Sequence, residues 1–280
     1  MRAQLSATEF DLFRNYIEQN CGISLSSEKK YLIETRLAGL LVESGSQSFT
    51  EFYRKLDASP GSRLRAQMID AMTTNETLWF RDGSPWIALR DHIIPELEAK
   101  ATGRHRIWSA ACSTGQEPYS IAMLIDHVSG MAGRRIMPSQ VEIVATDISS
   151  SALMVAQRGI YDRISMNRGF TGEWGSFKTK YFNATGAIST ISPSIKSRVK
   201  FRQFNLQGSL ASLGRFDVVF LRNVAIYFSE EFKKDLLNRI ANILNPGGLL
   251  LLGSAETTHG YSDRFKTASL GRAIAYRRAG

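Results

Sequence analysis

The chain has 280 residues, of which 43% are apolar and 22% charged, and its formal net charge is +9. This composition is ordinary for a globular protein, and the length suits one large domain with a smaller one. It excludes a membrane-spanning helix, because no run of about 18 apolar residues occurs. It also excludes a secretory signal peptide, because acidic residues interrupt residues 1–20. Cys21 and Cys112 lack metal-like spacing, so we expect buried thiols in a reducing compartment, the cytoplasm.

Positive charge is concentrated in one part of the chain. Residues 1–75 hold equal numbers of basic and acidic residues, whereas the only acids in residues 157–205 are Asp162 and Glu173. The basic residues of that second stretch are Arg158, Arg163, Arg168, Lys178, Lys180, Lys196, Arg198, Lys200 and Arg202. We interpret this stretch either as a solvated face or as a docking surface for an acidic partner, an anionic protein surface or nucleic acid.

Residues 1–72 carry helix signals and no strand signal. Ser6 and Glu9 have the spacing of a capping box, and apolar residues follow at helical spacing. A second helix is predicted over 27–45, and Ser48 and Glu51 form another capping box that opens a third. A fourth helix follows the break at 59–61 and ends near residue 72. The sequence therefore predicts an all-helical N-terminal domain, to which we assign residues 1–75.

Residues 76–280 show strands alternating with helices, the pattern of a parallel α/β sheet. The expected strands are 106–111, 141–146, 216–221, 249–253 and 273–276, and the expected helices are 86–99, 118–128, 150–157 and 230–244. Residues 157–205 interrupt this rhythm. The segments 181–182, 188–191 and 199–204 are predicted as short strands of a small antiparallel insert.

Polar residues follow the ends of the predicted strands, where open parallel sheets bind ligands. Gly115 and the small residues before it allow a ligand to approach the backbone closely, although no dinucleotide-binding G-x-G-x-x-G is present. Asp147 ends the second strand and is placed either to accept hydrogen bonds from ribose hydroxyls or to cap the next helix. Glu117 is either a ligand contact or an acid that complements the dipole of its helix.

Five segments together resemble the motifs of the chemotaxis receptor methyltransferases, the CheR family. They occur in the family's order, at 72–81, 108–120, 145–148, 204–206 and 221–228. The resemblance extends into the helical part, through residues 21–25, Lys30 and 36–37. It implies an all-α N-terminal domain and a Rossmann-like S-adenosylmethionine-dependent methyltransferase sheet with a small antiparallel β insert.

The resemblance also implies the ligand, the substrate and the site. The cofactor would be S-adenosylmethionine, and the substrates would be glutamate side chains on cytoplasmic helices of chemoreceptors, converted to γ-methyl esters. The positions that match cofactor contacts of the family are Asn75, Thr77, Arg81, Glu117, Asp147, Asn205, Leu206, Arg222 and Asn223.

The implied chemistry agrees with the residue types present. A glutamate carboxylate is ionised near pH 7, with a reference pKa of about 4.3, so it needs no general base to attack an electrophilic methyl group. No His–Asp or Cys–His arrangement and no metal-ligand spacing is evident, and we expect no metal. Arg81 and Tyr227 are the candidate catalytic residues. Arg81 can bind a carboxylate with two hydrogen bonds, and Tyr227 either flanks the methyl group or only packs on a helix.

Two alternatives stay open at this point. A nucleic-acid methyltransferase fits the pI of about 9.7 and the aromatic residues of the insert, although the Asp/Asn-Pro-Pro-aromatic motif of amino-methylating enzymes is missing. A non-catalytic cofactor sensor is the second alternative, but each pocket motif is present. Some family members hold a receptor's C-terminal tail with a Gly-bearing loop of the insert. The hairpin at 181–191 lacks that loop, so we expect the enzyme to work without the tail. We also expect a monomer.

Overall fold

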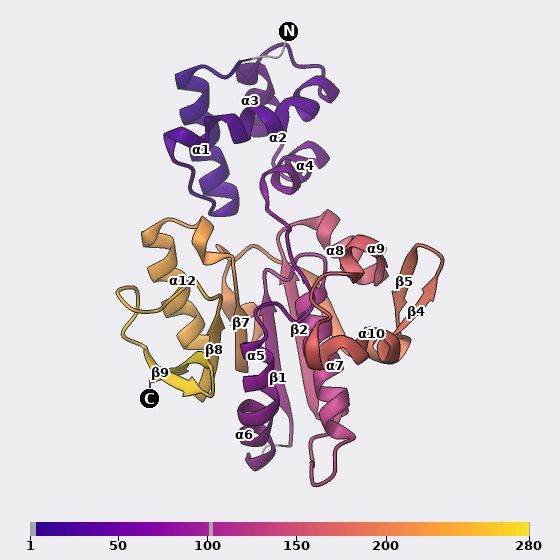
Figure 1. Cartoon of the computed structure of the whole chain (residues 1–280). Helices are drawn as coiled ribbons and strands as arrows, with labels where there is room; N and C mark the ends of the chain where they lie inside the picture. Colours follow the sequence, from indigo (N-terminus) through magenta and orange to yellow (C-terminus); the bar gives the residue numbers. More distant parts are fainter. Residues whose placement is uncertain (1–3, 101–102, 280) are drawn as a thin grey trace.

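The computed structural model describes residues 4–100 and 103–279, with a helical domain at one end of a larger α/β domain (Figure 1). The N-terminal elements are α1 (Ala7–Cys21), η1 (Ser27–Lys29), α2 (Lys30–Glu43), α3 (Phe49–Ala58) and α4 (Arg63–Met72). The capping box of Ser6 and Glu9 forms, and Gly22 ends α1 in the left-handed conformation with φ 72°. Buried side chains such as Phe13, Ile33 and Phe52 give these helices a core of their own. The prediction of an all-helical N-terminal part is confirmed.

Seven strands of the described residues form one sheet in the order β6-β2-β1-β7-β8-β10-β9. They are β1 (His105–Ala110), β2 (Val141–Asp147), β6 (Val199–Gln203), β7 (Phe216–Leu221), β8 (Leu244–Leu252), β9 (Phe265–Leu270) and β10 (Ala273–Arg278). The strands from β6 to β8 run parallel, and β10 pairs antiparallel with both β8 and β9. The predicted α/β sheet is confirmed, but the sequence prediction missed β9, in which half of the side chains are exposed.

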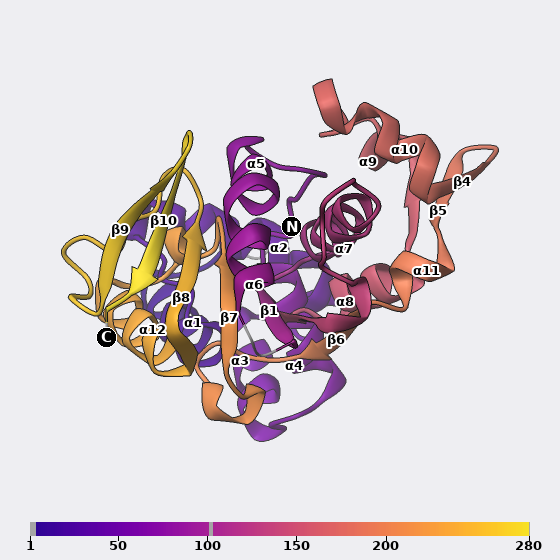
Figure 2. The ribbon, with the colours of Figure 1, turned by 90° about the horizontal axis from the view of Figure 1, so that it is seen from below.

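Helices cover both faces of this sheet (Figure 2). They are α5 (Ser84–Ala88), η2 (Leu89–Ile93), α6 (Ile94–Ala99), α7 (Gln116–Ser129), α8 (Ser150–Arg158) and α12 (Glu230–Ile243), with short turns η3 (Pro138–Gln140), η5 (Leu210–Leu213) and η6 (Ala225–Tyr227). Ile107 and Ile143 pack with α5 to α7, whereas Trp108 and Val219 pack with α12. Because successive side chains of a strand point to opposite faces, continuous apolar strands bury both faces of the sheet.

The small insert lies beyond the β6 edge of the sheet, on the side away from β9 (Figures 1 and 2). Its elements are β3 (Ile160–Asp162), α9 (Arg163–Met166), η4 (Gly172–Trp174), α10 (Gly175–Tyr181), β4 (Phe182–Thr185), β5 (Ile188–Ile191) and α11 (Pro193–Lys196). Strands β3, β5 and β4 form an antiparallel sheet in that order. One expectation is corrected: residues 199–203 are not part of the insert but form β6, which pairs with β2 in the main sheet. The polar alternation of this strand reflects its position at the sheet edge.

No helix within residues 4–100 and 103–279 is both long and apolar enough to cross a membrane.

Candidate active site

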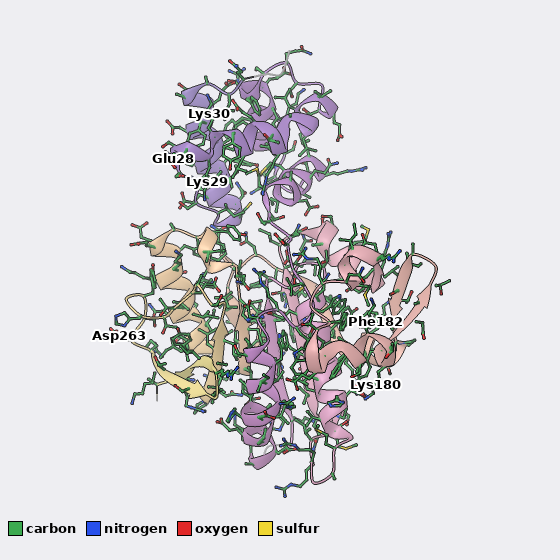
Figure 3. All side chains as sticks on the ribbon, viewed as in Figure 1. Glu28, Lys29, Lys30, Lys180, Phe182 and Asp263 are labelled. Atoms are coloured by element: carbon green, nitrogen blue, oxygen red, sulfur yellow. The ribbon has the colours of Figure 1, made fainter. Side chains whose placement is uncertain are left out.

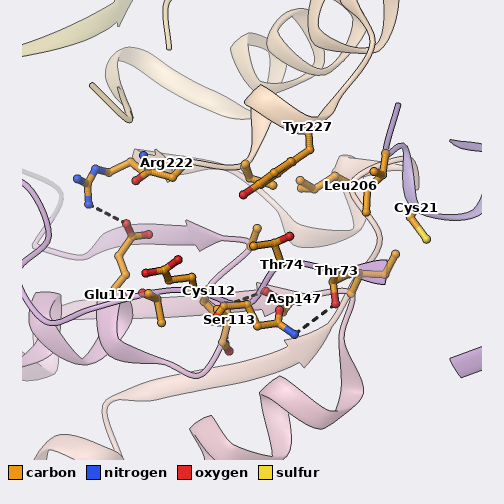
Figure 4. A pocket seen from close by; sticks show the side chains of 18 of the residues that line it. Cys21, Thr73, Thr74, Cys112, Ser113, Glu117, Asp147, Leu206, Arg222 and Tyr227 are labelled. Atoms are coloured by element: carbon orange, nitrogen blue, oxygen red, sulfur yellow. Dashed lines mark hydrogen bonds and ion pairs between the residues drawn. The ribbon is translucent and has the colours of Figure 1, made fainter. Parts of the chain in front are cut away.

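A cavity of about 940 Å³, including its opening to solvent, lies at the carboxyl ends of β1, β2 and β7. This end of the sheet faces the helical domain. Ligands of open α/β sheets bind in this place, and the volume suits a nucleoside-sized molecule. The side chains that line it come from the α4–α5 linker, from the loops after the three strands, from the segment after β6 and from the end of α1 (Figure 4). Every site residue predicted from the sequence lines this cavity: Asn75, Thr77, Arg81, Glu117, Asp147, Asn205, Leu206, Arg222, Asn223 and Tyr227.

The loop after β1 brings the backbone to the cavity. Ala111 and Ser113 have φ angles of 56° and 50°, in the left-handed region, and Gly115 has a φ of 95°. A Cβ at Gly115 would lie 2.8 Å from the Cβ of Ala156, so glycine is required by both conformation and space. Ser113 Oγ donates a hydrogen bond to the carbonyl of Asn75 at 2.8 Å, which ties this loop to the α4–α5 linker.

Asp147 ends β2 as a buried acceptor. Its two carboxylate oxygens accept hydrogen bonds from the backbone N–H groups of Ser113 at 2.7 Å and Ser149 at 2.9 Å. Burial raises the pKa of Asp147, although these N–H donors act in the opposite direction. Ser149, not Asp147, caps α8, because its hydroxyl accepts from the N–H of Ala152. Since a carboxylate offers about four acceptor positions, Asp147 keeps capacity for a pair of ligand hydroxyls.

Glu117 and Arg222 form a buried ion pair across the cavity floor (Figure 4). Glu117 lies in the first turn of α7 and also accepts from Ser109 Oγ at 2.8 Å. Burial raises the pKa of Glu117, and the charge of Arg222 opposes that rise. Arg222 donates to Asp82 at 2.7 Å and to the carbonyl of Arg81 at 3.0 Å. The side chain of Arg222 is 1% exposed, so it joins β7 to the linker and is a fixed part of the floor.

Arg81 and Tyr227 approach the cavity from different segments. The guanidinium of the half-buried Arg81 makes one long hydrogen bond, 3.4 Å to the carbonyl of Glu76, so it remains available to a ligand. The backbone carbonyl of Arg81 accepts from Trp86 Nε1 at 2.9 Å, which holds the main chain in place independently of the side chain. Tyr227, in η6, is half-buried and lies across the cavity from Asp147 (Figure 4).

The amides of Asn75 and Asn205 are already engaged in part. Asn75 Nδ2 donates to Thr73 Oγ1 at 3.2 Å. Asn205 Nδ2 donates to the carbonyl of Asn20 at 2.8 Å, so this side chain fastens the end of α1 to the α/β domain. Leu206 is buried and supplies an apolar wall beside them.

The end of α1 contributes cavity residues that the sequence analysis missed. Cys21 and Ile23 line the cavity, and Ile23 forms an isolated antiparallel bridge with Phe228. The N–H of Ser24 donates to the carbonyl of Tyr227 at 2.8 Å. The family motif at residues 21–25 was a signal for this contact. Because the motif lies in the helical part of the chain, the sequence did not indicate that it contacts the sheet domain. Both domains therefore build the cavity.

The cavity offers no metal centre in the described part of the chain, where no three His, Cys, Asp or Glu side chains gather around a common point. Both cysteines are buried and unpaired.

Comparison with known proteins covers both domains. A family model described as CheR methyltransferase, SAM binding domain, matches residues 75–274, and one described as CheR methyltransferase, all-alpha domain, matches residues 8–73. The chain is 46% identical over 272 residues to chemotaxis protein methyltransferase 1 of Pseudomonas aeruginosa, covering 96% of this chain and 97% of that protein. It is 41% identical over 273 residues to the chemotaxis protein methyltransferase of Vibrio parahaemolyticus, covering 98% of each. A relative from Borreliella burgdorferi is 35% identical over 268 residues, covering 93% of this chain and 92% of that protein.

Proposed function

This chain belongs to the CheR family of S-adenosylmethionine-dependent chemotaxis methyltransferases, and we propose that it methylates glutamate side chains on the cytoplasmic helices of chemoreceptors. The products are glutamate γ-methyl esters and S-adenosylhomocysteine, and the modification serves chemotactic adaptation. The observation that carries the proposal is the convergence of all predicted site residues on one cavity built by both domains.

The residues of the cavity fit the chemical groups of S-adenosylmethionine. The free acceptor positions of Asp147 suit two ribose hydroxyls, and Leu206 supports an apolar ring. Glu117, whose ion pair with Arg222 favours its charged form, offers a carboxylate to an ammonium group. The guanidinium of Arg81 suits a carboxylate, of either the cofactor or the substrate.

The reaction needs positioning more than acid–base chemistry. When bound, the sulfonium of S-adenosylmethionine supplies an electrophilic methyl group. The substrate carboxylate is ionised near neutral pH, so no residue of the cavity has to remove a proton. Arg81 and Tyr227, which line the cavity, then help to hold the two reactants in line, and such positioning can lower a barrier by about 7–11 kcal/mol.

The alternative of a nucleic-acid methyltransferase loses the support that the aromatic residues of the insert gave it. The aromatic residues that suggested base stacking are buried inside the insert, with exposures of 5% for Trp174 and 2% for Phe177. Trp174 stacks on Phe80, with ring centroids 4.8 Å apart, and is not presented to solvent. Single-strand binding requires aromatic faces that bases can reach.

Three finer points are also part of the proposal. The enzyme works without gripping a receptor tail, because Thr185 pairs with Ile188 and only Gly186 and Ala187 remain for the turn of the hairpin. It acts in the cytoplasm, where the substrate helices lie. We also propose that it acts as a monomer.

The direct test incubates the protein with radiolabelled S-adenosylmethionine and receptor-bearing membranes. We expect label on the receptor that alkali releases as methanol, since methyl esters hydrolyse in base. A receptor whose methylated glutamates are replaced by alanine is the control and should take up no label. Alkali-stable label, or label on nucleic acid, would contradict the proposal.

A further inference from the structure

The carboxylate of Glu256 accepts hydrogen bonds from backbone N–H groups of the loop that follows β7. Its Oε2 accepts from the N–H of Asn223 at 2.7 Å and of Gly253 at 2.7 Å. Its Oε1 accepts from the N–H of Val224 at 3.0 Å and of Ile226 at 3.3 Å. Both oxygens are therefore filled by backbone donors, and charge-assisted bonds of this kind are about twice as strong as neutral ones.

The loop that Glu256 holds has a conformation that needs support. Asn223 has a φ of 59°, in the left-handed region, which only a few per cent of non-glycine residues adopt and which asparagine tolerates better than most. Three donors of this loop point at one anion, an arrangement that leaves them without partners if the anion is removed. Gly253 permits the approach, because a Cβ there would lie 2.7 Å from Glu256 Oε2 and 2.9 Å from the N atom of Asn223.

Glu256 itself does not line the cavity within the described residues, but the loop it holds does. Asn223 and Tyr227 both line it, and the side-chain Oδ1 of Asn223 is buried without a hydrogen-bond partner. Burial raises the pKa of Glu117, and the nearby charge of Glu256 adds to that rise. Glu256 is thus close enough to influence the site electrostatically while it touches the site only through the loop.

We propose that Glu256 is a positioning residue for methyl transfer, which holds the loop 222–227 so that Asn223 and Tyr227 face the cavity. The inference rests on the proposed function, because Asn223 and Tyr227 matter only if the cavity binds the cofactor and the glutamate. Neither the capping pattern nor the strand pattern of the sequence marks Glu256, since its four donors come from residues up to 33 positions away.

The experiment compares Glu256→Gln with the matched control Asp263→Asn. Glutamine keeps the size of the side chain but places an NH2 donor where an oxygen accepts two N–H groups. Asp263 is exposed in the segment between β8 and β9 (Figure 3), and within the described chain its side chain forms no ion pair. We expect Glu256→Gln to lower kcat for receptor methylation by roughly tenfold and to weaken S-adenosylhomocysteine binding several-fold, through lost charge-assisted bonds. The receptor KM should not change, and Asp263→Asn should behave as wild type.

A purely structural role would lower the thermal midpoint while leaving kcat and affinity of the folded enzyme unchanged, and that result would overturn the proposal. If Glu256→Gln does not fold, Glu256→Asp decides the question. Aspartate keeps the charge but is shorter, so we expect an intermediate kcat, and a wild-type value would overturn the inference. If the wild-type protein methylated no receptor, the proposed function would fail. The affinity of these variants for S-adenosylhomocysteine, measured by calorimetry, would still show whether Glu256 positions the loop at the cavity.

Discussion

Arg222 Nη1 lies 3.2 Å from Glu117 Oε2, and this contact joins the end of β7 to the first turn of α7. The same guanidinium reaches Asp82 and the carbonyl of Arg81 in the α4–α5 linker. A buried ion pair of this kind gives weak evidence for stability, because both charges lose hydration. Its effect is to hold three chain segments at fixed positions around one cavity, which suits a site whose chemistry depends on orientation.

The first prediction concerns Asp147. We expect calorimetry to show binding of one S-adenosylmethionine per chain, with S-adenosylhomocysteine bound at least as well. Asp147→Ala should weaken both by more than about tenfold, or roughly 1.4 kcal/mol, because the ribose hydroxyls lose their acceptor. Asp147→Asn keeps one acceptor oxygen but places an NH2 group against the N–H of Ser113 or Ser149, so it should weaken binding as well. Equal affinities in wild type and variants would remove Asp147 from the cofactor site.

The second prediction concerns Arg81. Arg81→Ala should lower methyl transfer by more than about tenfold at saturating cofactor, roughly 1.4 kcal/mol of barrier. The fold should survive, because the carbonyl of Arg81, not its guanidinium, holds Trp86 and Arg222. Arg81→Lys keeps the charge without the two-pronged geometry, and we expect it to recover only part of the rate. An unchanged rate in Arg81→Ala would show that the residue only lines the cavity.

The third prediction concerns the contact between the domains at Gly22. A Cβ at Gly22 would lie 2.6 Å from the ring of Phe232, and its φ of 72° disfavours any side chain. Gly22→Ala should cost about 1–3 kcal/mol of stability. It should also weaken S-adenosylhomocysteine binding, because Cys21 and Ile23 beside it line the cavity. The control is Gly39→Ala in α2, where nothing lies within 4 Å and alanine should stabilise the helix by roughly 0.5–1 kcal/mol. Wild-type affinity for S-adenosylhomocysteine in Gly22→Ala would mean that the end of α1 covers the cavity without contributing to cofactor binding.

The sequence predicted the local features well, because they depend on neighbouring residues. The capping box at Ser6 and the bounds of β7 follow from spacing and apolar runs. The assignment of residues 199–203 to the insert was wrong, since the pairing of β6 with β2 depends on a partner far away in the chain. The cavity wall at Ile23 and the loop support by Glu256 were missed for the same reason. Neither has a local pattern, and both are defined by contacts with the loop after β7.

The fourth prediction concerns the positive charge of residues 157–205. Ion pairs neutralise only part of it: Arg168 pairs with Glu76, Lys180 with Asp126 and Lys200 with Glu142. The remaining cations should favour encounter with an acidic receptor bundle. Raising the ionic strength from about 0.1 M to about 1 M shortens the Debye length from about 10 Å to about 3 Å, so the receptor KM should rise while kcat stays constant.

Two double variants distinguish the effect of charge in residues 157–205 from the effect of the protein's net charge. Lys196→Gln with Arg198→Gln should raise the receptor KM at low salt. Lys266→Gln with Arg272→Gln removes the same charge from the exposed β9–β10 hairpin and should have little effect. Equal effects of the two pairs, or a KM that does not depend on salt, would show that residues 157–205 are only a solvated face.

The last prediction concerns the receptor tail. The β4–β5 hairpin has room for a turn of only two residues, Gly186 and Ala187, so it has no loop extension that could hold a receptor tail. Strand β4 is nevertheless an edge of the small sheet, and Asn183 and Ala184 are exposed on it. An extended peptide can add to such an edge through main-chain hydrogen bonds, but affinity and specificity then need pockets for its side chains. A strand of four residues offers few main-chain bonds.

We therefore expect the same kcat/KM for one receptor with and without its last few residues, measured at the same salt concentration. An isolated tail peptide should show no saturable binding in calorimetry. The hairpin variant Ala184→Pro removes a backbone donor from β4 and should leave receptor methylation unchanged if no peptide pairs there. Strong loss of methylation on removing the tail, together with tight peptide binding that Ala184→Pro abolishes, would show that the β4 edge is a tether despite its short turn.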